Sequence, residues 1–167
     1  MNEHVTQMEG SDGTAVPLDD LQPQTRRLHG CVVSRLPLGD QGLDEVYPAD
    51  GVTLKAVSDL ADAVRMLAMR RNGFNIAFIM YDDFSQQTVT IDLLRRLRVR
   101  SPNLPVVLIS TEFHAHDLTQ ERLCITDVSL RGPMTPGLMR IAVSAAVENN
   151  LAWRKRRRSL RLEKARR

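Results

Sequence analysis

The sequence predicts an α/β fold with one mostly parallel sheet, and three observations lead to this prediction. From residue 28 to about residue 150, short apolar runs alternate with segments whose apolar residues recur at helical spacing, which is the pattern of successive strand–helix units. The strongest runs show no polar alternation, as expected for strands that are buried on both faces. The chain has 167 residues, 43% of them hydrophobic, which is enough for one domain with a substantial core.

Five strands are expected. Each is a short run rich in Val, Ile or Leu that ends at polar, Gly or Pro residues. Their ranges are 31–33, 53–57, 74–81, 105–110 and 126–130. Five such units joined by right-handed crossovers give a flavodoxin-like (βα)5 doubly wound parallel sheet with strand order 2-1-3-4-5, and any site is then expected at the carboxyl ends of the strands.

Helical segments are expected between these strands. Between the first two, residues 36–51 contain Gly and Pro residues that leave room for only a turn or two of helix around 43–47. After the second strand, Ser58 is expected to cap a helix that ends at an Asn-Gly pair. A further helix is expected at 90–100, and a short polar one at 117–123.

The last helix is expected to begin after Thr135 as N-cap, with proline following at the first helical position, which proline favours. Its inward face is expected to carry Leu138, Ile141, Ala142 and Ala145. Neither Gly nor Pro occurs after Gly137, so the helix is expected to continue into the basic C-terminal segment. About 30 residues at 1.5 Å each give a length of roughly 45 Å, so this helix is expected to extend beyond the domain.

The charges divide the chain into three parts. Residues 1–26 hold five acids and one base, and they are expected to form a disordered acidic tail. Residues 27–150 carry the strand and helix pattern and form the expected domain. Residues 151–167 are expected to form a basic helical extension or linker, because 154–167 hold nine basic residues and one acid.

Several classes of protein are excluded by the sequence. No apolar run reaches the roughly 18 residues of a membrane helix and no signal peptide is present, so a cytoplasmic protein is expected. Cys31 and Cys124 lack metal-binding spacing and are expected to be small core residues. His114 and His116 are interpreted as loop residues, because side chains two apart on a helix do not face each other. No nucleotide-binding or nucleophile motif occurs, so neither a metal site nor an enzyme is expected.

Residues 91–110 read Ile-Asp-Leu-Leu-Arg-Arg-Leu-Arg-Val-Arg-Ser-Pro-Asn-Leu-Pro-Val-Val-Leu-Ile-Ser. This stretch resembles the third helix and fourth strand of the receiver (CheY-like) domain of bacterial two-component response regulators. Gly132-Pro133-Met134, 22 residues beyond Ser110, resembles the Lys-Pro-Phe turn after the fifth strand of that family. The resemblance covers about residues 28–150 and implies the same fold as the strand pattern does.

The resemblance also implies a site that transfers a phosphoryl group onto an aspartate. In that family the acceptor lies at the tip of the third strand, and two acids after the first strand hold Mg²⁺. A Ser or Thr follows the fourth strand, and a Lys follows the fifth. Metal and lysine neutralise charge on the transferring group, and the hydroxyl then contacts the phosphate.

Most of these positions are changed in this sequence. Ser34 and Arg35 occupy the metal-acid positions, and a guanidinium repels Mg²⁺ instead of binding it. Ser110 matches the hydroxyl position. Gly132 occupies the lysine position, with Arg131 one residue earlier.

The acceptor position has two assignments. Counting back from the matched third helix places Asp82 there, followed by Asp83, whereas counting along the third strand places Met80 there and implies a two-residue insertion. Asp82 and Asp83 are therefore degenerate acceptor candidates, and the sequence predicts a pseudo-receiver without a cofactor. The alternative is a working receiver that is phosphorylated on Asp82 with Mg²⁺, with Asp40 as a substitute metal ligand.

The basic segment is a second candidate site, for a polyanion. After Val147 and Leu151, the next positions of a coiled-coil seam fall on arginines, and no broad apolar face suits a membrane surface. The candidate polyanion-binding residues are Trp153, Arg154, Lys155, Arg156, Arg157, Arg158 and Arg161. The segment is interpreted as a linker helix to an output domain, as a nucleic-acid binder, or as a grip for a nucleotide whose base stacks on Trp153.

These observations predict a phosphorylation-independent signalling module in transcriptional control. The resemblance implies that it forms a homodimer or docks on a partner protein through the fourth helix, fifth strand and fifth helix. Here these elements correspond to residues 117–146. No membrane partner is expected.

Overall fold

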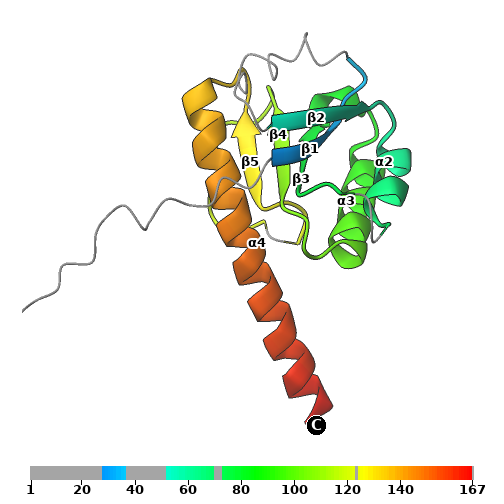
Figure 1. The fold of residues 1–167 in the computed structure, drawn as a ribbon, viewed down its shortest axis with the longest axis vertical. Helices are drawn as coiled ribbons and strands as arrows, with labels where there is room; N and C mark the ends of the chain where they lie inside the picture. The colour runs from blue at the N-terminus through cyan, green and yellow to red at the C-terminus, as the bar shows by residue number, and fades with distance from the viewer. Residues whose placement is uncertain (1–27, 37–51, 70–72, 123, 167) are drawn as a thin grey trace, which may run out of the picture.

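The computed structural model describes residues 28–36, 52–69, 73–122 and 124–166. Its centre is a parallel sheet of five strands in the order β2-β1-β3-β4-β5 (Figure 1). The strands are β1 (Leu28–Val33), β2 (Val52–Val57), β3 (Ile76–Met80), β4 (Val106–Ser110) and β5 (Val128–Arg131). The predicted fold class and strand order are confirmed.

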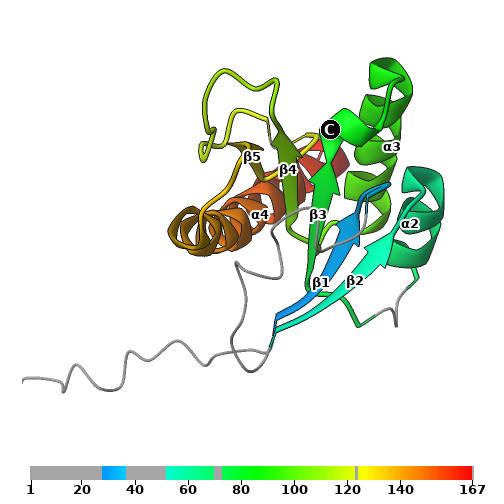
Figure 2. The same ribbon diagram turned by 90° about the horizontal axis from the view of Figure 1, so that it is seen from above.

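The helices cover both faces of this sheet. They are α2 (Leu60–Leu67), the 3₁₀ turn η3 (Tyr81–Asp83), α3 (Gln87–Arg100) and α4 (Pro136–Ala165). Helices α2 and α3 lie on one side and α4 on the other (Figure 2). Thr135 caps α4, since its side chain accepts a hydrogen bond from the amide of Leu138 at 3.3 Å. As predicted, α4 continues without a break for 30 residues, and its C-terminal half extends beyond the sheet (Figure 1).

Two apolar clusters form the core, one on each face of the sheet. Successive residues of a strand point to opposite faces, so in β1 the side chains of Cys31 and Val33 join the cluster under α2 and α3, while Val32 joins the cluster under α4. In β3, Ile79 and Phe78 divide in the same way. This two-sided burial is why these strands show no polar alternation.

A buried ion pair joins α3 to the start of β5. Both Nη atoms of Arg98 donate to the carboxylate of Asp127, at 2.7 and 2.8 Å, and both side chains are at most 1% exposed. The amide of Val106 donates to the same carboxylate at 2.8 Å. From α4, Asn149 Nδ2 donates to the carbonyl of Asp127 at 2.8 Å, and Asn150 Nδ2 to its Oδ2 at 3.5 Å. These contacts connect α3, α4 and the amino edge of the sheet.

The prediction of a short helix at 117–123 is wrong: the residues of this range that the structure describes form no helix. Asp117 forms an isolated antiparallel bridge with Ser129 of β5 instead, through bonds of 2.7 and 2.9 Å. Its carboxylate accepts from the amide and hydroxyl of Thr119, at 2.9 and 2.6 Å. Asn149 of α4 donates to the carbonyl of Thr119 at 3.2 Å. Because these bonds use groups that a helix would need, the segment forms turns along the edge of β5.

The predicted cap of α2 and one predicted core residue are also wrong. Asp59, not Ser58, caps α2, because its carboxylate accepts from the amide of Asp62 at 2.8 Å and a negative charge is favoured at a helix N-terminus. Cys31 is fully buried as predicted, whereas Cys124 is exposed. Cys124 lies in the turn that precedes β5, and a turn at the surface does not bury its side chains.

The predicted inward face of α4 is correct except for Ile141: Ala142 is buried, and Leu138 and Ala145 are partly buried against the cluster between α4 and the sheet. Ile141, expected to point inward, is 58% exposed. The buried residues of α4 are Met139, Ala142, Ala146, Asn149 and Asn150. Apolar residues occur on several sides of this helix, so the sequence alone did not define the inward side.

Some predictions fall outside the described residues. These are the acidic tail at 1–26, the turn of helix around 43–47, and Asp40. Within the described ranges, no helix combines the length and apolar character needed to cross a membrane.

Candidate functional site

Polar residues gather where β1, β3, β4 and β5 end. Ser34 follows β1, Asp82 and Asp83 lie in the turn η3 directly after β3, Ser110 is the last residue of β4, and Gly132 follows β5. Because the carboxyl ends of parallel strands meet at one edge of the sheet, these residues form a single candidate site. This is the place that the strand order predicted.

The positions expected to hold a metal bind Asp83 instead. The hydroxyl of Ser34 donates to Oδ2 of Asp83 at 2.7 Å, and the amide of Arg35 donates to the same oxygen at 2.8 Å. The guanidinium of Arg35 lies over the ring of Phe84, 5.6 Å from its centroid. Ser34 is buried, whereas Asp83 is only partly buried. The two residues after β1 therefore contribute hydrogen-bond donors here, where a metal site needs carboxylates.

Asp82 is bound in a similar way from β4. Its Oδ1 accepts from the hydroxyl of Ser110. Its Oδ2 accepts from the amide and the hydroxyl of Thr111, at 2.7 and 2.8 Å. Burial raises the pKa of Asp82, but the hydrogen bonds from Ser110 and Thr111 outweigh it and hold the pKa below its ordinary value. The carboxylate is thus held ionised, with both oxygens occupied by donors.

The two residues assigned to the acceptor position lie differently at the end of β3. The β3–β4 ladder ends with Met80 opposite Ile109, and Asp82 follows on the 3₁₀ turn. The count along the strand, which places Met80 at its tip, agrees with this geometry. Met80 packs against the apolar cluster under α4, and its thioether has no oxygen to accept a phosphoryl group.

The lysine position contributes no charge to the site. A Cβ on Gly132 would lie 3.4 Å from Cγ2 of Thr111, so this position does border the residues that bind Asp82. Arg131, one residue earlier, turns toward the segment after β4. Its Nη1 donates to the carbonyl of His114 at 3.1 Å, and its amide donates to Nδ1 of His116 at 3.1 Å.

These residues do not fit a Mg²⁺ site. Mg²⁺ is usually held by one or two carboxylates together with several waters. Here Asp82 and Asp83 already accept hydrogen bonds, and the residues at the two metal-acid positions are Ser34 and Arg35, neither of which has a carboxylate. Among the residues that the structure describes, no cluster of three or more His, Cys, Asp or Glu side chains could hold a metal ion.

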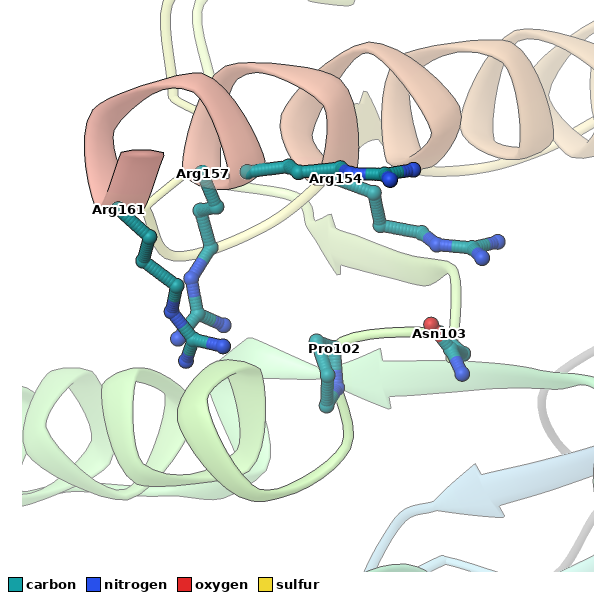
Figure 3. A pocket seen from close by; sticks show the side chains of 6 residues that line it. Pro102, Asn103, Arg154, Arg157 and Arg161 are labelled. Carbon is teal, nitrogen blue, oxygen red and sulfur yellow. The ribbon is translucent and has the colours of Figure 1, made fainter. Parts of the chain in front are cut away.

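The candidate polyanion residues divide into two sets on α4. Arg154, Arg157, Arg158 and Arg161 line a groove that Pro102 and Asn103 close on the other side (Figure 3). Lys155 and Arg156 are exposed and do not line it. Trp153 is half-buried, with the guanidinium carbons of Arg98 and Arg157 lying 5.3 and 5.6 Å from its ring centroid. Its ring is therefore in contact with two guanidinium groups of this chain.

Thr111, Arg98 and Asp127 take part in these arrangements and were missed at the sequence level. Thr111 directly follows Ser110, so a Ser-Thr pair at the end of a predicted strand was an available signal. Arg98 lies four residues after the apolar Leu94 and thus on the same face of the helix expected at 90–100. A cation on an apolar face is a signal for a buried partner, although the sequence does not identify that partner.

A scan against models of protein families finds no match, and a search of curated proteins finds none. Solved structures do match. A response regulator receiver domain protein from Clostridium thermocellum is 17% identical with a TM-score of 0.56, covering 75% of this chain and 98% of that one. The signal receiver domain of an HD domain-containing protein from Pseudomonas fluorescens is 19% identical with a TM-score of 0.56, covering 79% and 95%. The receiver domain of the Francisella response regulator 1452 is 18% identical with a TM-score of 0.53, covering 72% and 97%.

Proposed function

Starting from the response-regulator receiver fold of this chain, we propose that it is a signalling module that works without phosphorylation. The observation that carries the proposal is the hydrogen bonding of Asp82. In a working receiver the hydroxyl after the fourth strand is available to contact a phosphate. Here the hydroxyl of Ser110 and both donors of Thr111 are directed to the carboxylate itself. Asp83 is held in the same manner by Ser34 and Arg35.

The module acts by contact with a second copy or a partner protein. The surface proposed for this contact is residues 117–146, where the turns along β5 meet the first half of α4. The bridge between Asp117 and Ser129 pairs part of the edge of β5, so docking there depends on side chains more than on strand addition. On α4, the exposed side chains of Ile141, Val147 and Leu151 provide apolar area along this face and just beyond it.

The proposed process is transcriptional control in the cytoplasm. Helix α4 belongs both to the proposed contact surface and, through its unbroken C-terminal half, to the basic extension. A change in what binds the first half of α4 is therefore transmitted along one rigid element. The basic end links to an output domain or binds a polyanion.

Incubating the full chain with acetyl phosphate and Mg²⁺ is expected to leave its intact mass unchanged. The reason is that the acceptor carboxylates are engaged, the metal ligands are replaced and the lysine is absent. Intact-mass spectrometry measures the result, with a working receiver treated in parallel as the control. A mass increase of one phosphoryl group that disappears in Asp82→Ala would contradict the proposal.

A further inference from the structure

The groove beside α4 brings four arginines together on one helix face. Arg154, Arg157, Arg158 and Arg161 follow the spacing i, i+3, i+4, i+7, which places side chains on the same side of a helix. They border a space of about 210 Å³ against the loop after α3. Figure 3 shows Arg157 and Arg161 directed from α4 toward the loop that carries Pro102.

The charge of this face is not neutralised within the described part of the chain. The ion pairs found there lie within 4.0 Å and involve Arg65, Arg95, Arg98 and Arg122, and none involves these four arginines. Glu163, the one acid of the basic segment, lies two residues after Arg161 and so points away from the arginine face. A concave surface lined with positive charges concentrates a positive electrostatic potential, which attracts anions.

The arginine face is fixed to the domain. Arg157 Nη1 donates to the carbonyl of Arg98 at 3.3 Å, and its guanidinium also packs on Trp153. Trp153 also contacts Arg98, which is held by the buried ion pair with Asp127. The groove is therefore preorganised, which reduces the entropy lost when a ligand binds.

Length and lining indicate the class of ligand. Arg154 and Arg161 are seven residues apart, so the face spans about 10 Å along the helix, more than one phosphate group needs. Guanidinium groups match phosphate oxygens in bidentate geometry. The lining of the groove contains no aromatic residue on which a base could stack, and the ring of Trp153 is already contacted by Arg98 and Arg157. These features favour an extended phosphate chain over a single nucleotide.

We propose that this groove binds the phosphodiester backbone of a nucleic acid without reading its bases. Arg157 sets the position of the backbone against the domain, and Arg154, Arg158 and Arg161 neutralise successive phosphates. The inference goes beyond the receiver-like site and does not depend on whether Asp82 accepts a phosphoryl group.

Binding is measured by fluorescence anisotropy with the full chain and labelled 20-mer probes, single- and double-stranded, of unrelated sequences. If about four phosphates are neutralised, the slope of log affinity against log salt on duplex DNA is about −3.6, and affinity falls about 150-fold between 50 and 200 mM salt. Unrelated sequences are expected to bind within about threefold of each other, because backbone contacts carry no sequence information.

Two matched double variants separate the groove from the general charge of the helix. Arg158→Gln with Arg161→Gln removes two groove cations and is expected to reduce the slope by about 2 units. Lys155→Gln with Arg156→Gln removes the same charge from outside the groove and is expected to change affinity at 200 mM salt by less than about threefold, since screening limits distant charges. All four side chains are exposed, so both variants are expected to retain the melting temperature of the parent chain.

Three results would overturn the inference. Equal loss of binding in the two double variants would assign the interaction to total charge and not to the groove. Displacement of the probe by inorganic triphosphate at equal phosphate concentration would assign the groove to small phosphate compounds. Displacement by poly-glutamate at equal charge would assign it to acidic polypeptides.

Discussion

Replacing Asp127 by alanine is expected to lower the free energy of unfolding by about 3 to 5 kcal/mol. The change leaves the guanidinium of Arg98 buried beside α4 without its carboxylate. Burial raises the pKa of Asp127 and lowers that of Arg98, against their mutual attraction, so the charged pair is formed at a high desolvation cost. Removing Asp127 leaves the desolvation cost of the buried Arg98 in place and removes the attraction that offsets it. Urea unfolding followed by circular dichroism measures the difference.

Asp92→Ala is the matched control, because it removes a carboxylate from an exposed pair. Asp92 lies 3.6 Å from Arg95 on the surface of α3, with both side chains more than half exposed, and its loss is expected to cost less than about 1 kcal/mol. The double variant Arg98→Met with Asp127→Leu removes both charges and is expected to recover much of the lost stability. An Asp127→Ala variant as stable as Asp92→Ala would show that the Arg98–Asp127 pair is solvated.

Met139→Ala is expected to destabilise the domain by about 2 to 5 kcal/mol. Met139 is 0% exposed in the cluster between α4 and the sheet, and its truncation leaves a cavity under the helix that carries the basic extension. The same unfolding experiment measures this loss.

Ile141→Ala tests the orientation of α4 on the sheet. Ile141 is 58% exposed, so its truncation is expected to change stability by less than about 0.5 kcal/mol. The face predicted from the sequence gives the opposite order of the two losses, because it includes Ile141 among its four inward residues and does not include Met139. If Ile141→Ala lowered the free energy of unfolding more than Met139→Ala does, Met139 would not be the side chain that α4 buries against the sheet.

The sequence was sufficient for the strands and their order, because uninterrupted apolar runs and the intervening helices restrict a chain of this length to few topologies. It was also sufficient for the start of α4, since Thr135 and Pro136 are local signals. It did not reveal Arg98 as a core residue, because its partner Asp127 lies 29 residues further along the chain. The helix expected at 117–123 failed for a similar reason, since Asn149 and Ser129 bind that segment from distant parts of the chain.

The sequence identified the residues of the candidate site but not the hydrogen bonds between them. Ser34 and Asp83 are 49 residues apart, and Asp82 and Ser110 are 28 apart, so their hydrogen bonds depend on the folded sheet. Whether Met80 or Asp82 lies at the tip of the strand depends on which residue ends β3. Sequence patterns locate the end of a strand only to within a few residues. The direction of Arg131, away from the site and toward His114, likewise depends on the fold.

The most direct test of whether Asp82 and Asp83 bind a metal or a phosphoryl group uses the backbone amide resonances of residues at the carboxyl ends of the strands. They are followed in ¹H–¹⁵N spectra during addition of Mg²⁺ and then of beryllium fluoride, which binds an aspartate carboxylate as a phosphoryl group does. The resonances of Ser34, Asp83 and Thr111 are expected to stay in place, because Oδ2 of Asp83 and both oxygens of Asp82 already accept hydrogen bonds from this chain. Saturable shifts centred on Asp82 and Thr111 would instead show a working receiver site and contradict the proposed function.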